Sequence, residues 1–232
     1  MIPPTSPVHA LLDGNASWAD AVDRADPGFF QRSAKGQSPK APLPIHPLFV
    51  SHPTQVLWFG CSDSRVPESV ITGARPGDIF VHRNVANQCH PDDDSALAVL
   101  SYAVGTVGVE HVIVAGHTCC GGAAACYEAV TARSATATGL EIKTPLHAGS
   151  HPSWSSSPLS TSASTPADGA LDLIVHENVK RQVEHVCATD AIQQAWAAGK
   201  QVSVHGWVYD VGSGRIRDVG VSRGPLGVPV QL

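Results

Sequence analysis

Three side chains able to bind a metal stand where apolar runs of the sequence end. Cys61 closes the run at 57–60, and His117 and Cys120 follow the run at 111–115 in an H-x-x-C spacing. Because the carboxyl ends of parallel strands meet at one edge of a sheet, we expect these side chains to converge there. Two thiolates and one imidazole are typical zinc ligands, and three protein ligands leave one tetrahedral position open, as in catalytic zinc sites. The pattern therefore predicts a zinc ion (Zn²⁺) that activates water.

An acidic and a basic residue follow the first of these ligands. Asp63 and Arg65 are two positions apart, so they face the same side of an extended turn. Arg65 is expected to hold the carboxylate in a bidentate pair and keep it ionised. Asp63 then either accepts a hydrogen bond from zinc-bound hydroxide and orients it, or ligates the zinc itself and closes the open position.

Structural and non-catalytic interpretations of the same residues also stay open. Cys61 and Cys120 can be small buried hydrophobic residues with His117 as a turn residue, and Asp63 and Arg65 can be a solvated ion pair. A non-catalytic zinc scaffold would need neither Asp63 nor Arg65. Cys119, beside Cys120, can be an alternative ligand, half of a redox-sensitive pair, or an inert neighbour that points away.

Other zinc enzymes fit the motifs poorly. A zinc deaminase is disfavoured because the chain lacks the H-x-E and P-C-x-x-C pair. An alcohol dehydrogenase is disfavoured because no G-x-G-x-x-G fingerprint is present; the sequence GSG at 212–214 continues as Arg-Ile-Arg.

Composition restricts partners and location. The 232 residues carry a net charge of −5 without a run of Lys or Arg, which argues against a nucleic-acid partner. No apolar run approaches the roughly 18 residues of a membrane span. The N-terminus lacks the basic and apolar regions of a signal peptide, and four aspartates up to Asp26 disfavour a transit peptide. We expect a cytoplasmic protein, in which six cysteines indicate metal or thiol chemistry more than disulfides.

Strand and helix patterns alternate along the chain. Apolar runs predict strands over 56–59, 79–82, 111–115, 202–209 and 216–221. Helical periodicity predicts helices over 13–34, over 97–107 behind an acidic start at 92–94, and over 171–187. This alternation predicts an α/β fold: a mainly parallel sheet with helices on both faces and an antiparallel edge strand from the final hairpin.

We expect one domain over residues 1–232. It would carry an N-terminal helical arm at about 10–35 and irregular insert loops at 36–54, where five prolines stand between 38 and 53, and at 131–170, which is rich in Ser, Thr, Ala and Pro. The alternative for 131–170 is a disordered linker between two domains.

The motifs resemble a known family, the β-class carbonic anhydrases. The sequences CSDSR at 61–65, HRNVAN at 82–87 and GHTCCGG at 116–122 match its three signature blocks in order. Further matches lie at 76–78, 101–104, 177–179 and 205–209. The resemblance covers most of the chain except 36–54 and 131–170.

The resemblance implies an enzyme that reversibly hydrates carbon dioxide to bicarbonate and a proton. Its zinc ligands would be Cys61, His117 and Cys120, and its catalytic pair Asp63 and Arg65, with Asp63 as a conditional fourth ligand. It implies a four-stranded parallel sheet extended by an antiparallel strand. It also implies a homodimer or a dimer of dimers, with the N-terminal helix reaching over the partner. Tyr102 matches a family tyrosine near the substrate cleft.

A finer resemblance concerns regulation. Trp58, Arg83 and Tyr209 match a trio that holds an inhibitory bicarbonate in the bacterial-like subgroup; the alternative is that both aromatic residues are simply core. Arg75 stands where plant-like members carry a glutamine. The nearest rival function is a hydrolase of the same fold that acts on carbonyl sulfide or carbon disulfide, which the sequence does not separate from carbon dioxide hydration.

Overall fold

The computed structural model describes residues 7–33, 56–136 and 168–225. Contacts divide the chain into two compact units, Met1–Pro53 with Pro76–Asp78, and Thr54–Arg75 with Ile79–Leu232. A single domain over 1–232 therefore stays a prediction. The elements in chain order are α1 (Pro7–Ala25), α2 (Phe29–Ser33), β1 (Val56–Cys61), α3 (Glu68–Thr72), β2 (Ile79–Asn84), η1 (Val85–Asn87), α4 (Asp94–Tyr102), η2 (Ala103–Val107), β3 (His111–His117), α5 (Gly121–Thr136), α6 (Asp168–Ala188), α7 (Asp190–Ala197), β4 (Ser203–Asp210) and β5 (Arg215–Asp218).

The N-terminal unit holds two helices, where the sequence predicted one over 13–34. α1 ends at Ala25 because Pro27 has no N–H to continue the helical ladder and Gly28 takes a left-handed φ of 81°. α2 then begins at Phe29, and the ring of Phe30 lies edge-on to that of Trp18 at 5.7 Å. The single long helix was wrong.

One five-stranded sheet forms the centre of the second unit. Its order is β2-β1-β3-β4-β5, parallel throughout except for the antiparallel β4–β5 hairpin. This arrangement confirms the predicted fold class. Because Gly60 on β1 pairs with Ala115 on β3, Cys61 ends its strand beside the last residues of β3. The register thus places one strand end next to the other.

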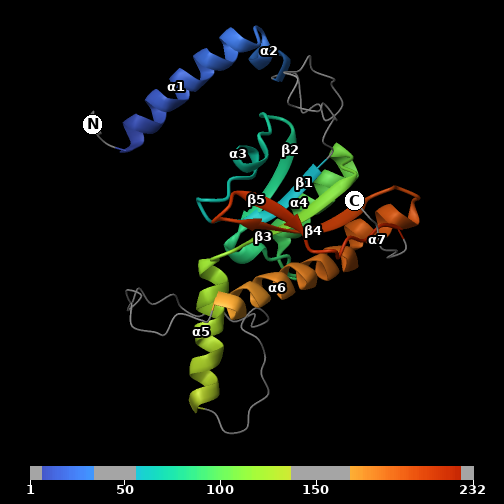
Figure 1. The fold of residues 1–232 in the computed structure, drawn as a ribbon. Coiled ribbons are helices and arrows are strands. Elements are labelled where there is room, and N and C mark those ends of the chain that lie inside the picture. The colour runs from blue at the N-terminus through green and yellow to red at the C-terminus, as the bar shows by residue number, and fades with distance from the viewer. Residues whose placement is uncertain (1–6, 34–55, 137–167, 226–232) are drawn as a thin grey trace. The chain divides into compact units, whose positions relative to one another are not determined.

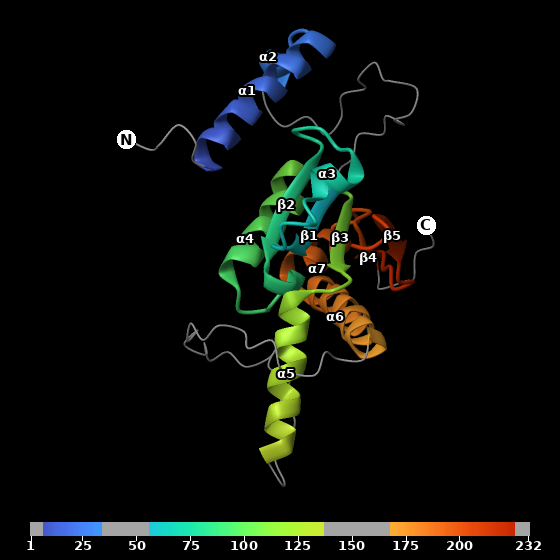
Figure 2. The same ribbon diagram turned by 60° about the vertical axis from the view of Figure 1, so that its left-hand side comes forward.

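Helices cover both faces of this sheet, unequally. α4, α6 and α7 pack on one face over Leu57 and Phe59, and α6 contributes a buried stripe of valines, Val175, Val179, Val183 and Val186. The other face carries a smaller cluster around Trp58 and Ile113, to which α3 adds Ile71. Figure 1 shows α6 running along the sheet, and Figure 2 shows α4 beside β2 with β5 at the opposite edge.

Several helices differ from their predicted bounds. α3, α5 and α7 were not predicted, because two are short and α5, rich in Gly and Ala, shows no apolar stripe. The predicted loop 131–170 is wrong at both ends, since α5 continues to Thr136 and α6 begins at Asp168. The predicted insert at 36–54 lies outside the described residues. None of the helices that the structure describes is long and apolar enough to cross a membrane.

Two glycines allow α6 to approach the sheet closely. A Cβ on Gly116 of β3 would lie 2.6 Å from Val179 Cγ2, and one on Gly206 of β4 would lie 3.0 Å from Val179 Cγ1. Real Cβ atoms essentially never show a contact as short as the first, and the second is tighter than most, so Val179 fills the space that these glycines leave. Gly116 directly precedes His117, so the packing of Val179 against Gly116 also sets how close the end of β3 lies to α6.

We expect Gly116→Ala to lower the free energy of unfolding by about 1–3 kcal/mol, because the added methyl overpacks against Val179. Adding Val179→Ala should make the double variant less destabilised than the sum of the two single changes. Chemical denaturation measures both values. Gly105→Ala is the matched control, since nothing lies within 4 Å of its Cβ position. Equal stability of Gly116→Ala and Gly105→Ala would show that the close approach is not real.

Candidate metal centre

The structure brings the three predicted ligands together at the carboxyl edge of the sheet. Cys61 ends β1, His117 ends β3, and Cys120 stands directly before α5. Their ligand atoms all lie within 4.8 Å of one another, and all three side chains are buried. In the described part of the chain this is the only cluster of three or more such donors.

His117 is oriented for coordination through one ring nitrogen. Its Nδ1 lies 2.9 Å from the carbonyl oxygen of Thr118, to which a protonated Nδ1 donates. That tautomer leaves a lone pair on Nε2, which is buried without a hydrogen-bond partner among the described residues. A buried polar atom without a partner is unfavourable. A cation between the three donors would satisfy it.

The two thiols are electrostatically unequal. The Cys120 thiol donates to Cys61 and lowers the Cys61 pKa to about 4 against the effect of burial, and the backbone N–H groups of Asp63 and Ala86 act in the same direction. The same pairing and burial raise the pKa of Cys120. In the metal-free protein the pair therefore shares one proton. A bound cation would replace that proton and stabilise both thiolates.

Asp63 and Arg65 form the expected bidentate pair. Arg65 Nε donates to Asp63 Oδ1 at 2.9 Å and Nη2 to Oδ2 at 2.7 Å, and the Arg65 backbone N–H adds a third bond. These donors hold the pKa of the Asp63 carboxyl well below its usual range. Asp63 Oδ2 lies 3.9 Å from His117 Nε2, so the ionised carboxylate borders the metal site without belonging to the ligand cluster.

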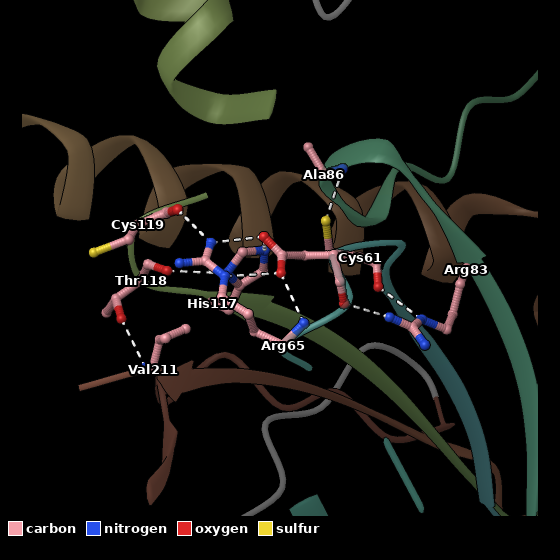
Figure 3. A network of polar contacts seen from close by, with 9 residues as sticks. Cys61, Arg65, Arg83, Ala86, His117, Thr118, Cys119 and Val211 are labelled. Carbon is pink, nitrogen blue, oxygen red and sulfur yellow. Dashed lines mark hydrogen bonds and ion pairs between the residues drawn. The ribbon is translucent and has the colours of Figure 1, made fainter. Parts of the chain in front are cut away.

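Cys119 contributes its backbone to this arrangement. Its carbonyl accepts a 2.9 Å hydrogen bond from Arg65 Nη2, and its φ of 54° is left-handed. The thiol is exposed, and Figure 3 shows its sulfur pointing away from Cys61. The geometry favours the interpretation of Cys119 as a neighbour that is not a ligand. Sequence reasoning missed the role of its carbonyl, because no side-chain pattern reports a backbone contact.

Arg83 supports the site from the neighbouring strand. Its Nε donates to the Cys61 carbonyl and its Nη2 to the Asp63 carbonyl, both at 2.7 Å (Figure 3), while Nη1 lies 3.7 Å from Glu68 Oε2. Strand alternation places Arg83 on the same sheet face as Trp58 and Tyr209. Trp58 is buried in the smaller cluster, whereas Tyr209 packs against the larger one.

Tyr102 lies at the end of α4. Half of its surface is exposed, and its ring centroid is 5.8 Å from that of Phe80. Its place in a substrate cleft stays a prediction.

Comparison with known proteins identifies the family. The family model for carbonic anhydrase matches residues 56–216. The chain belongs to the carbonic anhydrases. Two curated relatives carry that name: one from Emericella nidulans is 32% identical over 91% of this chain and 82% of its own length, and one from Saccharomyces cerevisiae is 31% identical over 92% and 89%.

Solved structures place the chain in the β-class of this family. A tetrameric β-carbonic anhydrase from Sordaria macrospora superposes with a TM-score of 0.67 at 30% identity, covering 93% of this chain and 98% of its own. A Coccomyxa β-carbonic anhydrase in complex with acetazolamide gives a TM-score of 0.67 at 29% identity, covering 92% and 86%. The resemblance seen in the motifs is confirmed at the level of the class. The bacterial-like subgroup stays a prediction.

The left-handed φ of Cys119 predicts different effects for two substitutions at this position. We expect Cys119→Gly to keep the zinc content and stability of the parent, because glycine adopts this conformation without cost. Cys119→Val should lower the free energy of unfolding by about 1–2 kcal/mol, since a side chain with a branched Cβ resists a positive φ. Elemental analysis and denaturation of the two variants measure these outcomes. Loss of zinc in Cys119→Gly would instead make the Cys119 thiol a ligand.

Proposed function

We propose that this protein hydrates carbon dioxide reversibly to bicarbonate and a proton, with a zinc ion held by Cys61, His117 and Cys120. The observation that carries the proposal is the convergence of three buried donor atoms within 4.8 Å in a chain of the carbonic anhydrase family.

The donor set fits zinc in number and kind. Two sulfurs and one imidazole nitrogen suit this ion, and three protein ligands leave a position for water. The Nε2 of His117, which has no hydrogen-bond partner in the described part of the chain, belongs to this same cluster. Bound zinc would supply a water molecule that loses its proton near neutral pH.

Asp63 would orient that water and Arg65 would hold Asp63. The Arg65 donors keep the carboxylate ionised at neutral pH, so it is available only as a hydrogen-bond acceptor. If Asp63 accepts a hydrogen bond from a water molecule at the open zinc position, it fixes the orientation of that water. A lone pair of the water oxygen would then point toward a carbon dioxide molecule on the opposite side. Both roles of Asp63 considered from the sequence remain part of the proposal, including ligation of zinc in a resting state.

Substitution of the ligands tests the zinc site. Cys61→Ser and His117→Ala should lose zinc and carbon dioxide hydration together, because a three-residue site does not survive the loss of one donor. Elemental analysis and stopped-flow hydration with a pH indicator measure the two effects. Stoichiometric zinc in either variant would remove the ligand assignment.

Asp63→Asn separates metal binding from catalysis. It should keep zinc and lower kcat on the order of 100-fold, because an amide no longer offers the same ionised acceptor. Asp92→Asn is the matched control, since the side chain of Asp92 is 90% exposed. Full activity of Asp63→Asn would remove the orienting role of Asp63, and a parent protein that binds zinc without hydrating carbon dioxide would favour a non-catalytic scaffold. Turnover of carbonyl sulfide or carbon disulfide alone by the parent would instead assign the rival hydrolase reaction.

The regulatory trio is a finer part of the proposal. Trp58, Arg83 and Tyr209 share one sheet face, so an anion there would meet a guanidinium, an indole N–H and a phenol O–H. Arg83 also donates to the Cys61 and Asp63 carbonyls. Withdrawal of its guanidinium toward bicarbonate would release the backbone beside the metal site.

Tyr209→Phe tests this trio without disturbing Arg83. We expect the variant to retain hydration activity and to need about tenfold more bicarbonate for half-inhibition, because one hydrogen bond to a charged ligand is lost. Inhibition curves at fixed pH and ionic strength measure the change. Identical curves for the parent and the variant would argue that Tyr209 is only a core residue.

We also infer a homodimer or a dimer of dimers, which the tetrameric Sordaria enzyme supports. Light scattering of the zinc-loaded protein tests this state, and a monomer at micromolar concentration would contradict it. The cytoplasmic location stays a prediction.

A further inference from the structure

A turn of unusual conformation stands behind the metal site. Ala86 and Asn87, which follow β2, have left-handed φ values of 60° and 49°, although neither is glycine. A left-handed conformation costs roughly 1–2 kcal/mol for a residue with a Cβ. Such a turn persists only where its surroundings hold it in place.

The turn contacts a metal ligand through its backbone. The N–H of Ala86 points at Cys61 Sγ, 3.4 Å away (Figure 3). On its other side the carbonyl of Ala86 accepts two amide hydrogen bonds, from Gln88 Nε2 at 2.6 Å and from Asn178 Nδ2 at 2.9 Å. Ala86 is therefore fixed between the thiolate and a pair of amide side chains.

These amides belong to a closed network that joins the turn to α6. Gln88 Nε2 also donates to Asn178 Oδ1 at 2.9 Å, and Gln182 Nε2 donates to Asn178 Oδ1 at 3.1 Å and to Gln88 Oε1 at 3.0 Å. Gln182 Oε1 accepts from the backbone of Cys89 at 2.8 Å. Asn178 is 8% exposed and Gln182 is 2% exposed.

The polar face of α6 leaves the turn little freedom. A buried amide that loses its partner costs about 1–3 kcal/mol, so Asn178 and Gln182 favour the one turn conformation that satisfies them. The same helix is pressed against β3 and β4 through Val179. α6 thus sets the position of Ala86 relative to Cys61.

We propose that Gln88 and Asn178 are positioning residues that hold the Ala86 N–H on the Cys61 sulfur and thereby increase the affinity of the site for zinc. The inference rests on the proposed function for the identity of the ligands. An N–H donor stabilises the negative charge on the sulfur and fixes its position, so the ligand is preorganised for a cation. Neither side chain touches the sulfur itself in this network.

Two substitutions of similar shape test the inference. Asn178→Leu and Gln88→Met each remove one donor to the Ala86 carbonyl. We expect each to weaken zinc binding about tenfold, measured by competition with a chromophoric chelator. In protein loaded with cobalt(II), the sulfur-to-cobalt charge-transfer band should move to longer wavelength, because a thiolate with a weaker N–H bond gives up its electrons more easily.

Val186→Ala is the matched control. It lies on α6, is fully buried and stands two turns beyond Asn178, so it loosens the core without touching the turn. We expect parental zinc affinity and an unmoved cobalt band from this variant.

The outcomes separate this inference from the proposed function. A parent protein that binds neither metal overturns the proposed zinc site. A parent that binds zinc, with variants that bind it equally well, overturns only the positioning role. Weaker binding with an unmoved cobalt band, or an equal loss in Val186→Ala, also overturns it, because general loosening would explain either result. If Asn178→Leu does not fold, Gln88→Met provides the test, because Gln88 is only half-buried.

Discussion

The convergence of three buried donor atoms at one edge of the sheet is the constraint on which the rest of the site depends. The ligand atoms of Cys61, His117 and Cys120 lie within 4.8 Å of one another and away from solvent. Among the described residues the imidazole Nε2 has no hydrogen-bond partner, which is unfavourable in a buried site. The parallel register of β1 and β3 brings the groups together, and a bound cation would make their proximity favourable.

Two left-handed turns then connect the backbone to this centre. The turn at Ala86 presents an N–H to the Cys61 sulfur, and the turn at Cys119 presents a carbonyl to Arg65. In each case the unusual φ aims a backbone dipole at a group that is charged when the site is assembled. The conformational cost is offset by a charge-assisted hydrogen bond and by packing, which explains why non-glycine residues are found there.

The sheet and the convergence of the ligands could be predicted because they follow from local patterns. Apolar runs that end in Cys61 and His117 mark buried parallel strands, and the carboxyl ends of such strands are adjacent. The break of the first helix at Pro27 was also predictable, because a Pro-Gly pair ends a helix. The amide network was beyond prediction: Gln88 and Asn178 are 90 positions apart, and buried amides leave no periodic signal before α6 is docked. The short helices α3 and α7 were missed because five to eight residues carry too little periodicity.

The contacts of Arg65 constrain both proposed roles of Asp63. Both carboxylate oxygens are occupied by Arg65, whose Nη2 is also bound to the Cys119 carbonyl next to the ligand Cys120. Arg65 therefore fixes the position of the Asp63 carboxylate relative to the loop that contains Cys119 and Cys120. For Asp63 to become a fourth ligand, its carboxylate would have to move toward the donor cluster, which would strain these charge-assisted bonds. Because Arg65 keeps the carboxyl ionised well below neutral pH, protonation of Asp63 does not govern this exchange in the neutral range. With zinc bound as proposed, the guanidinium and the metal would compete for one carboxylate.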